Sequence, residues 1–305
     1  MVIINYLFIC LIFGTTFLTI KMGIEAGAPP LFSAGIRFFA AGLLVVLYFV
    51  VKRHPVTLFL LSKKVAFAGF CLTFMTFATL YWAEQYITSG LAAVLSATGP
   101  MMILFVQAKR NKTIIKREQF IALIVALAGV ICISLPGFHQ ELSYMWVIAC
   151  AVILGGEVFY AIGTLNSKEI LTTEKDVSPF LINGVQMLYG GSMLLMFSIV
   201  TEQPNPAVLT TWDVWGPIVY LIFIGSIGGH GLYYWLISKT NPVFPSTWLY
   251  ISPLIAVAAG YVFLDEPVKP IMGLGAAFIL GGVFLANRTT LQSYWKQGKL
   301  FKKAV

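Results

Sequence analysis

Five ionisable side chains fall inside or at the ends of long apolar segments of this 305-residue chain, and they are the residues best placed to do chemistry. Glu157 and His230 lie a few residues past the centres of their segments, whereas Lys21, Arg37 and Glu84 lie nearer segment ends. An ionisable group in hydrocarbon costs about 2.5 kcal/mol or more on insertion scales. Each such group is therefore a candidate functional residue.

Glu157 is the first candidate, because the stretch Gly155–Tyr160 places its carboxyl deep in an apolar segment beside small residues. A buried carboxyl that exchanges a proton can couple proton flow to the movement of another solute. The alternative is a protonated or hydrogen-bonded packing residue. The sequence leaves both interpretations open.

His230 and Arg37 also have two interpretations each. Glycines flank His230 and permit close approach of a ligand or a helix, so its imidazole is either a proton relay or a satisfied structural side chain. Arg37 is expected to face the bundle and to pair with Glu84 or a backbone carbonyl, and the alternative is recognition of a substrate carboxylate. Lys21 is expected to extend its amine to the membrane interface.

Aromatic and small polar residues form a second group of candidates. Tyr and Trp commonly form belts at membrane interfaces. The alternative is that their rings line a path for a compact organic solute, with hydroxyl and amide groups supplying hydrogen bonds. The candidates are Tyr81, Trp82, Tyr160, Tyr234, Trp235, Trp248, Thr15, Thr98 and Gln186.

The elements that carry these residues are predicted to be transmembrane helices. Hydrophobic residues make up 59% of the chain and charged residues 10%, which excludes a soluble globular domain. The pattern predicts an all-α integral membrane protein with ten transmembrane helices. The apolar segments run roughly over residues 3–21, 31–51, 65–86, 88–108, 118–135, 143–166, 179–200, 214–238, 243–264 and 268–287.

The chain also matches itself at an offset of 153 residues, which indicates a duplication. Leu80–Trp82 aligns with Tyr233–Trp235. Each copy holds five segments, and an odd number of crossings inverts the second copy, as in many secondary transporters. The predicted units are a first five-helix repeat over 1–135, an inverted second repeat over 143–287 and a basic cytoplasmic tail over 288–305.

Pro100 and Pro253 interrupt apolar segments at equivalent places in the two copies and are the predicted helix breaks. A proline removes a backbone donor from a helix. Paired interruptions in inverted repeats point to a central binding site. Inherited kinks without a ligand role are the alternative.

The net charge of +8 is explained by membrane topology, so no nucleic-acid partner is expected. If both termini are cytoplasmic, nearly all lysines and arginines lie on that side, and the opposite loops contain only Lys269, with Lys21 at a helix end. The positive-inside rule therefore predicts a multi-pass protein of the cytoplasmic membrane with both termini inside.

Motifs for enzymes, metals and cofactors are absent from the sequence. The cysteines lack a metal-binding spacing, and HExxH, GxSxG and the GK[ST] phosphate loop do not occur. We therefore expect no catalysis, no metal and no cofactor. A channel is disfavoured, because two unlike halves offer no ring of matching filter residues.

The chain resembles the ten-helix, two-repeat EamA-type branch of the drug/metabolite transporter superfamily over nearly all of its length. The resemblance implies a transporter with a cavity lined mainly by the first, third, fourth, sixth, eighth and ninth helices. One departure is that Thr113 stands where a Gly-Glu-Arg-like turn is usual, opposite Glu266 of the second copy. The resemblance rests on Phe13–Phe17 with Lys21, Pro30–Gly42, Tyr81–Pro100, Ser252–Pro253, Asp265–Pro267 and Gly281–Val283.

These features predict a secondary transporter that exports amino acids, related metabolites or amphipathic compounds by alternating access. Its expected partners are a small organic solute, protons as a candidate coupling ion, and the lipid bilayer. The alternatives are an uptake carrier for a sugar or an organic anion, and a non-transporting membrane sensor. The sequence specifies neither the substrate nor the oligomeric state.

Overall fold

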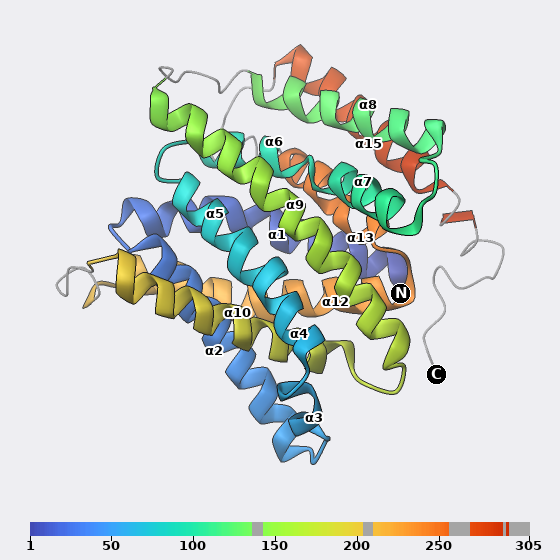
Figure 1. Ribbon diagram of the computed structural model, residues 1–305. Coiled ribbons are helices and arrows are strands. Elements are labelled where there is room, and N and C mark those ends of the chain that lie inside the picture. Colours follow the sequence, from blue (N-terminus) through green and yellow to red (C-terminus); the bar gives the residue numbers. More distant parts are fainter. Residues whose placement is uncertain (136–142, 204–209, 256–268, 289–290, 293–305) are drawn as a thin grey trace.

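The computed structural model describes residues 1–135, 143–203, 210–255, 269–288 and 291–292, and all regular structure in this part of the chain is helical (Figure 1). Seven helical segments in the described part are long and apolar enough to cross a membrane. The all-α membrane class is therefore confirmed. The seven are Val2–Glu25, Pro30–Val51, Lys63–Ala83, Ser89–Asn111, Tyr144–Thr173, Pro179–Thr201 and Trp212–Lys239.

Several of these segments are divided into shorter elements. The first two are α1 (Val2–Glu25) and α2 (Pro30–Val51), followed by the short α3 (Val56–Leu60). The fifth and sixth are α9 (Tyr144–Thr173) and α10 (Pro179–Thr201). The others consist of α4 (Lys63–Ala68), η1 (Gly69–Met75) and α5 (Thr76–Ala83); α6 (Ser89–Ser96) and α7 (Gly99–Asn111); and α11 (Trp212–Tyr220), η4 (Leu221–His230) and α12 (Gly231–Lys239).

Three further apolar helices complete the described part. They are α8 (Arg117–Ser134), the shorter helical stretch Val243–Ile255 that begins with α13 (Val243–Ser246), and α15 (Pro270–Ala286). The predicted ninth segment, 243–264, and Glu266 extend into residues outside the described part. Ten crossings and two inverted five-helix repeats therefore remain predictions.

Two π-helical stretches occur inside longer helices, and they lie at corresponding places. η1 covers Gly69–Met75, and the 153-residue offset carries this range into η4 at 221–230. A π-helical stretch is uncommon and often marks a functional position, because the wider turn redirects side chains. Both stretches carry residues that line the cavity described below or contact residues beside it.

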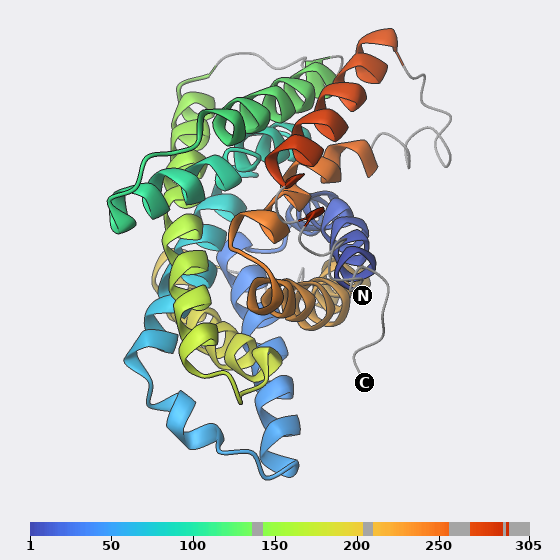
Figure 2. The same cartoon turned by 90° about the vertical axis from the view of Figure 1, so that its right-hand side faces the viewer.

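Close helix contacts rely on small residues. α2 packs along α10, where a Cβ on Gly42 would lie 2.5 Å from the Leu188 backbone nitrogen and 2.7 Å from the Gly184 carbonyl oxygen. α8 and α15 lie side by side (Figures 1 and 2), and a Cβ on Gly129 would lie 2.6 Å from the Gly275 carbonyl oxygen. Such approaches favour dispersion contacts between helices in lipid.

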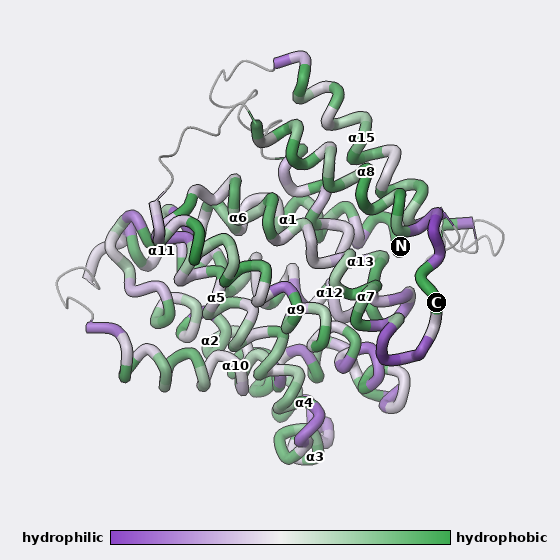
Figure 3. The backbone as a smooth tube through the Cα atoms, turned by 45° about the horizontal axis from the view of Figure 1, so that its top comes forward, coloured by the Kyte–Doolittle hydropathy of each residue, from purple (hydrophilic) through white to green (hydrophobic). Residues whose placement is uncertain are grey.

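The outer surface of the bundle matches a hydrocarbon environment. Figure 3 shows hydrophobic residues along the helices and hydrophilic ones mainly near helix ends, for example beside α3 and α4. On α1, the side chains of Leu7, Leu11 and Leu18 are more than half exposed. Exposed apolar side chains on several successive turns of a helix are typical of contact with membrane lipid.

Two neighbouring glycines of α15 provide a matched test of this packing. Gly282→Ala places a methyl group 2.5 Å from the Ala122 carbonyl oxygen, whereas a Cβ on Gly281 meets no atom within 4 Å. We expect Gly282→Ala to destabilise the protein by about 1–3 kcal/mol through overpacking. Gly281→Ala should be neutral or slightly stabilising, because alanine favours a helix. Thermal unfolding in detergent measures both, and equal melting temperatures would contradict this helix contact.

Candidate functional site

A cavity of about 50 Å³ lies in the interior of the bundle. Its lining comes from α1, α2, the η1–α5 segment, α6, α9, the η4–α12 segment and the stretch Val243–Ile255. Its volume has room for only a few water molecules. An organic solute needs several times as much space, so the structure shows the cavity in a contracted form. The lining residues are Phe13, Thr16, Phe17, Ile20, Arg37, Leu72, Thr76, Phe77, Leu80, Ser96, Glu157, Tyr160, His230, Tyr233, Trp248 and Leu249.

Glu157 of α9 lines this cavity with a carboxyl that is only partly bonded. The residue is 5% exposed, Ser96 also lines the cavity, and the Glu157 Oε2 atom has no hydrogen-bond partner. Gly99, in the first turn of α7, makes room for this oxygen, because a Cβ there would lie 2.5 Å from it. The carboxyl is thus able to accept a further donor, from a ligand or from water.

Arg37 of α2 is held by neutral partners. Its Nε donates to the Ser226 hydroxyl at 2.9 Å, and its Nη1 donates to the Tyr81 hydroxyl at 3.2 Å. The guanidinium carbon lies 4.5 Å from the centroid of the Phe38 ring, a cation–π distance. The prediction that Arg37 pairs with Glu84 is wrong, because both Glu84 carboxylate oxygens are buried without a hydrogen-bond partner. Dipoles and rings therefore stabilise this charge.

The second half of the chain makes the corresponding contact without a charge. Gln186 of α10 aligns with Arg37, and Thr73 of η1 aligns with Ser226. The Thr73 hydroxyl donates to Gln186 Oε1 at 2.8 Å. Both contacts join a helix of one half to a π-helical stretch of the other half, but only the one made by Arg37 brings a positive charge to the cavity.

His230, the last residue of η4, lies among aromatic rings. Its ring centroid is 5.1 Å from that of Phe13, 5.5 Å from that of Phe38 and 5.6 Å from that of Phe77, each in an edge arrangement. The residue is 7% exposed, and Nδ1 has no hydrogen-bond partner. This nitrogen is available to a ligand or a water molecule in the cavity.

The structure brings five of the predicted site residues together. Arg37, Glu157, Tyr160, His230 and Trp248 all line the cavity. Four of them come from α2, α9 and η4, and Trp248 follows the turn at Thr247, so residues far apart in the sequence meet at one place.

The other predicted residues lie outside the cavity lining. Tyr81 supports Arg37, as described above, and Gln186 bonds Thr73. Tyr234 is fully buried and its hydroxyl bonds that of Ser167 at 2.8 Å. The Trp82 ring packs against that of Tyr86 in a tilted arrangement, with centroids 4.9 Å apart.

Thr15, Thr98 and Trp235 also make local contacts instead of lining the cavity. The Thr15 hydroxyl donates to the Ile12 carbonyl and bonds the Tyr220 hydroxyl at 2.7 Å. The Thr98 hydroxyl donates to the Leu95 carbonyl at 2.8 Å. Trp235 lies beside a separate depression near Lys175 and Pro179.

Tyr233 lines the cavity, whereas its neighbour Tyr234, a predicted site residue, does not. Its hydroxyl bonds that of Tyr160 at 2.7 Å and that of Thr164 at 3.1 Å. Residues three apart lie on the same face of a helix. Tyr233 stands three residues after His230, as Tyr160 does after Glu157, and this spacing is the sequence signal that places Tyr233 on the cavity side.

The two prolines differ in their position relative to the observed helix breaks. Pro100 lies in the first turn of α7, directly after the break at Ala97–Thr98. Pro253 lies within a helical stretch, six residues after the turn at Thr247. Both breaks border the cavity, because one positions Gly99 against Glu157 and the other precedes Trp248.

The described residues contain no cluster of three or more histidine, cysteine or acidic side chains able to hold a metal ion, and all four cysteines are free thiols. The cavity therefore offers a carboxyl, a guanidinium and an imidazole, arranged among rings and aliphatic groups. This combination suits binding of a small amphipathic solute more than it suits metal chemistry.

A bundle of apolar helices long enough to span a membrane, around a buried cavity with ionisable groups, is the arrangement expected of a membrane transport protein. The sequence model of the EamA-like transporter family matches residues 1–135 and 147–288. The chain therefore belongs to this family, and the resemblance to drug/metabolite transporters is confirmed.

Relatives with known names agree with this assignment. The chain is 28% identical to the uncharacterized inner membrane transporter YedA of Escherichia coli strain K12, covering 91% of this chain and 87% of YedA. It is 25% identical to the uncharacterized transporter sll0355 of Synechocystis, with the same coverage, and 26% identical to the protein PagO of Salmonella typhimurium, covering 83% and 82%. A crystal structure with 13% identity superposes with a TM-score of 0.75, covering 94% of this chain and 97% of that chain, which shows a shared fold.

The contact between Gly99 and Glu157 gives a specific prediction. A methyl group at Gly99 must displace the Glu157 carboxyl, which is the flexible end of its side chain. Gly99→Ala is therefore expected to change the melting temperature little but to lower solute transport about tenfold, because the carboxyl is misplaced. The control is Gly90→Ala in the same segment, where a Cβ meets no atom within 4 Å. Equal transport by the two variants would contradict a role for this carboxyl position.

Proposed function

We propose that this protein is a secondary permease that exports amino acids, related metabolites or other small amphipathic compounds by alternating access. The membrane transporter class is given by the family. The substrate class, the direction and the mechanism are the proposal.

The observation that carries the proposal is that a basic and an acidic side chain line the same cavity. Arg37 supplies a guanidinium, and Glu157 supplies a carboxyl with one unpartnered oxygen. A zwitterionic solute can place its carboxylate near the first and its ammonium near the second. A neutral sugar needs neither group, so the lining favours an amino-acid-like solute.

The rest of the lining supports an amphipathic substrate. Phe13, Phe17, Phe77 and Trp248 present rings, and Leu72 and Leu80 present aliphatic surface. Rings can bind an apolar side chain, and their faces also attract an ammonium group. A compact solute with one charged end and one apolar end matches this shell.

Alternating access is supported by the contracted cavity. Its polar lining residues Arg37, Glu157 and His230 are each less than one-tenth exposed, so the solute must enter through a different conformation. The proposal places both termini on the cytoplasmic side. The basic residues Lys64 and Arg110 gather at the same end of the bundle as Lys168, as the positive-inside rule requires.

An uptake carrier for an organic anion is the second candidate, because no carboxylate pairs with Arg37 in the described part of the chain. An anionic solute would then be the counter-ion of this buried guanidinium. A membrane sensor that transports nothing is the third candidate.

Counterflow into liposomes distinguishes these candidates. Purified protein is reconstituted and screened with labelled amino acids, sugars, organic anions and cationic dyes, with and without a pH gradient. We expect exchange of amino acids or amphipathic cations. Flux of organic anions or sugars alone supports the uptake carrier, and the absence of flux for every compound supports the sensor.

A proton-coupling role for Glu157 gives a separate prediction. Glu157→Gln removes the exchangeable proton and preserves the size of the side chain. Substrate exchange should remain, whereas accumulation driven by a pH gradient should be lost. The control is Glu118→Gln on the exposed surface at the start of α8, which should leave both activities intact. Undiminished gradient-driven accumulation by Glu157→Gln would falsify proton coupling through this residue.

A further inference from the structure

Lys21, near the end of α1, bonds the end of another helix in its own half of the chain. Its Nζ donates to the carbonyl oxygen of Glu84 at 2.7 Å and to that of Ile87 at 3.2 Å. These carbonyls follow the last turn of α5. The expectation that Lys21 only extends to the interface therefore misses its role as a link between two helices.

Lys168, near the end of α9, makes the corresponding link in the second half. Its Nζ donates to the carbonyl oxygen of Ile237 at 2.8 Å and to that of Thr240 at 2.9 Å. The 153-residue offset carries Glu84 onto Ile237 and Ile87 onto Thr240. The same two carbonyl positions are thus bound by a lysine in both halves.

Each link has a clear physical origin. The last carbonyls of a helix lack partners within the helix, and they form the negative end of its dipole. An ammonium group with three donors satisfies two of them at once. Both lysines are half-buried, so water competes weakly for these bonds.

The two lysines lie at opposite ends of the cavity. α1 and α9 run in opposite directions in the bundle (Figure 1), and each carries its lysine near its final residues. Ile20, the neighbour of Lys21, lines the cavity, as does Tyr233, one turn before Ile237. Each lysine therefore joins two cavity-lining segments just beyond the cavity.

We propose that Lys21 and Lys168 are the two latches of the transport cycle, each closing one end of the central cavity and each released in turn. The proposal rests on the transport function proposed above. In the structure both lysine links are made, and the cavity has its small volume of about 50 Å³.

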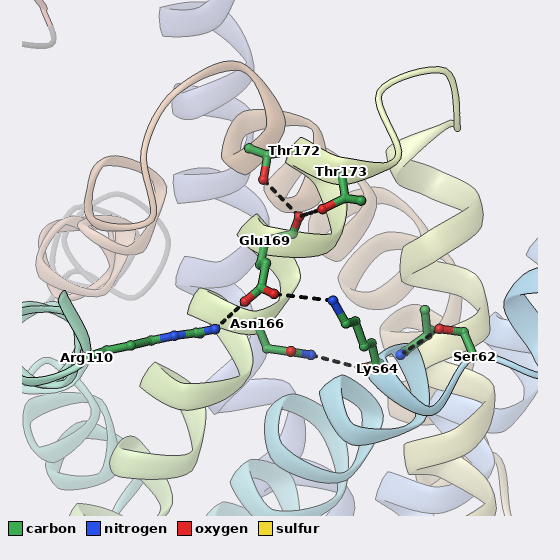
Figure 4. Close-up of polar contacts among 8 residues, drawn as sticks. Ser62, Lys64, Arg110, Asn166, Glu169, Thr172 and Thr173 are labelled. Carbon is green, nitrogen blue, oxygen red and sulfur yellow. Dashed lines mark hydrogen bonds and ion pairs between the residues drawn. The ribbon is translucent and has the colours of Figure 1, made fainter.

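The end that Lys168 closes has additional ionic contacts (Figure 4). Glu169 pairs with Arg110 of α7 and, at 3.3 Å, with Lys64 of α4, and the Asn166 amide donates to the Lys64 carbonyl at 2.9 Å. These contacts join α9 to helices of the first half. We expect this end to stay closed more firmly than the end at Lys21 when its lysine is removed.

Accessibility of a cavity cysteine to a charged, membrane-impermeant thiol reagent tests the latches. The four native cysteines are replaced, and Thr76→Cys provides the reporter in the cavity lining. Labelling is measured in right-side-out and inside-out vesicles. Lys21→Met and Lys168→Met are compared with Lys63→Met, a control on an exposed lysine at the start of α4.

With both termini cytoplasmic, we expect Lys21→Met to raise labelling about tenfold from the outer face of the membrane. Lys168→Met should raise labelling from the cytoplasmic face, by a smaller factor. Adding Glu169→Gln to Lys168→Met should increase labelling further. Lys21→Arg and Lys168→Arg, which keep the charge and the donors, should restore low labelling. Labelling unchanged from that of Lys63→Met, or raised from the same face by both variants, would overturn the proposal.

Lys21→Gln and Lys168→Gln give a second measurement if a methionine variant fails to fold. The glutamine amide can still donate a hydrogen bond, so each variant should raise labelling from the same face as its methionine counterpart, by an intermediate factor. If neither variant raises labelling, the latches are overturned. The labelling needs no substrate. If the two variants raise labelling from opposite faces but no solute is transported, the latches are supported and the transport function is contradicted. If solute is transported but labelling is unchanged, transport is supported and the latches are contradicted.

Discussion

Hydrocarbon offers no hydrogen-bond partner, and this constraint governs the structure. Backbone groups must be satisfied inside helices, which explains why the described elements are helical. Helix ends add a further demand, because their last carbonyls have no partner within the helix. Lys21 and Lys168 satisfy such carbonyls, and Glu202 satisfies the opposite kind of end, by accepting from the Leu31 and Phe32 backbone amides at 2.7 and 2.8 Å.

The same constraint makes the interior charges informative. Arg37 retains its charge through the Ser226 and Tyr81 hydroxyls and the faces of aromatic rings. Glu157 and His230 each keep one polar atom without a partner in the same cavity. Unpaired buried polar groups are costly, and a solute bound in this cavity would supply the missing partners of these two atoms. Their retention around one cavity connects the energetics of the fold with the binding of a solute.

The two halves of the chain make corresponding contacts, and the residues that could bind a solute are those at which the halves differ. The carbonyls that the two lysines bind correspond by the 153-residue offset, and so do Thr73 and Ser226. Arg37 is the exception, because Gln186 occupies its place in the other half without a charge. The matching lysine links of the two halves suit a cavity whose two ends open and close in turn. The charge of Arg37, which has no counterpart, makes one side of the cavity positive. The ionic contacts of Glu169 add a second asymmetry, at one end only.

The sequence by itself determined the helical membrane class, the family and the short set of interior ionisable residues, because apolar length and the cost of buried charge are local properties of the chain. The tertiary structure alone decided which of these residues share a cavity. It selected Tyr233 over Tyr234, left Glu84 unpaired with Arg37, and turned Lys21 into a link between helices. The physical reason is that the orientation of a side chain depends on helix rotation and on π-helical stretches and breaks, which are set by packing between distant segments and not by local composition.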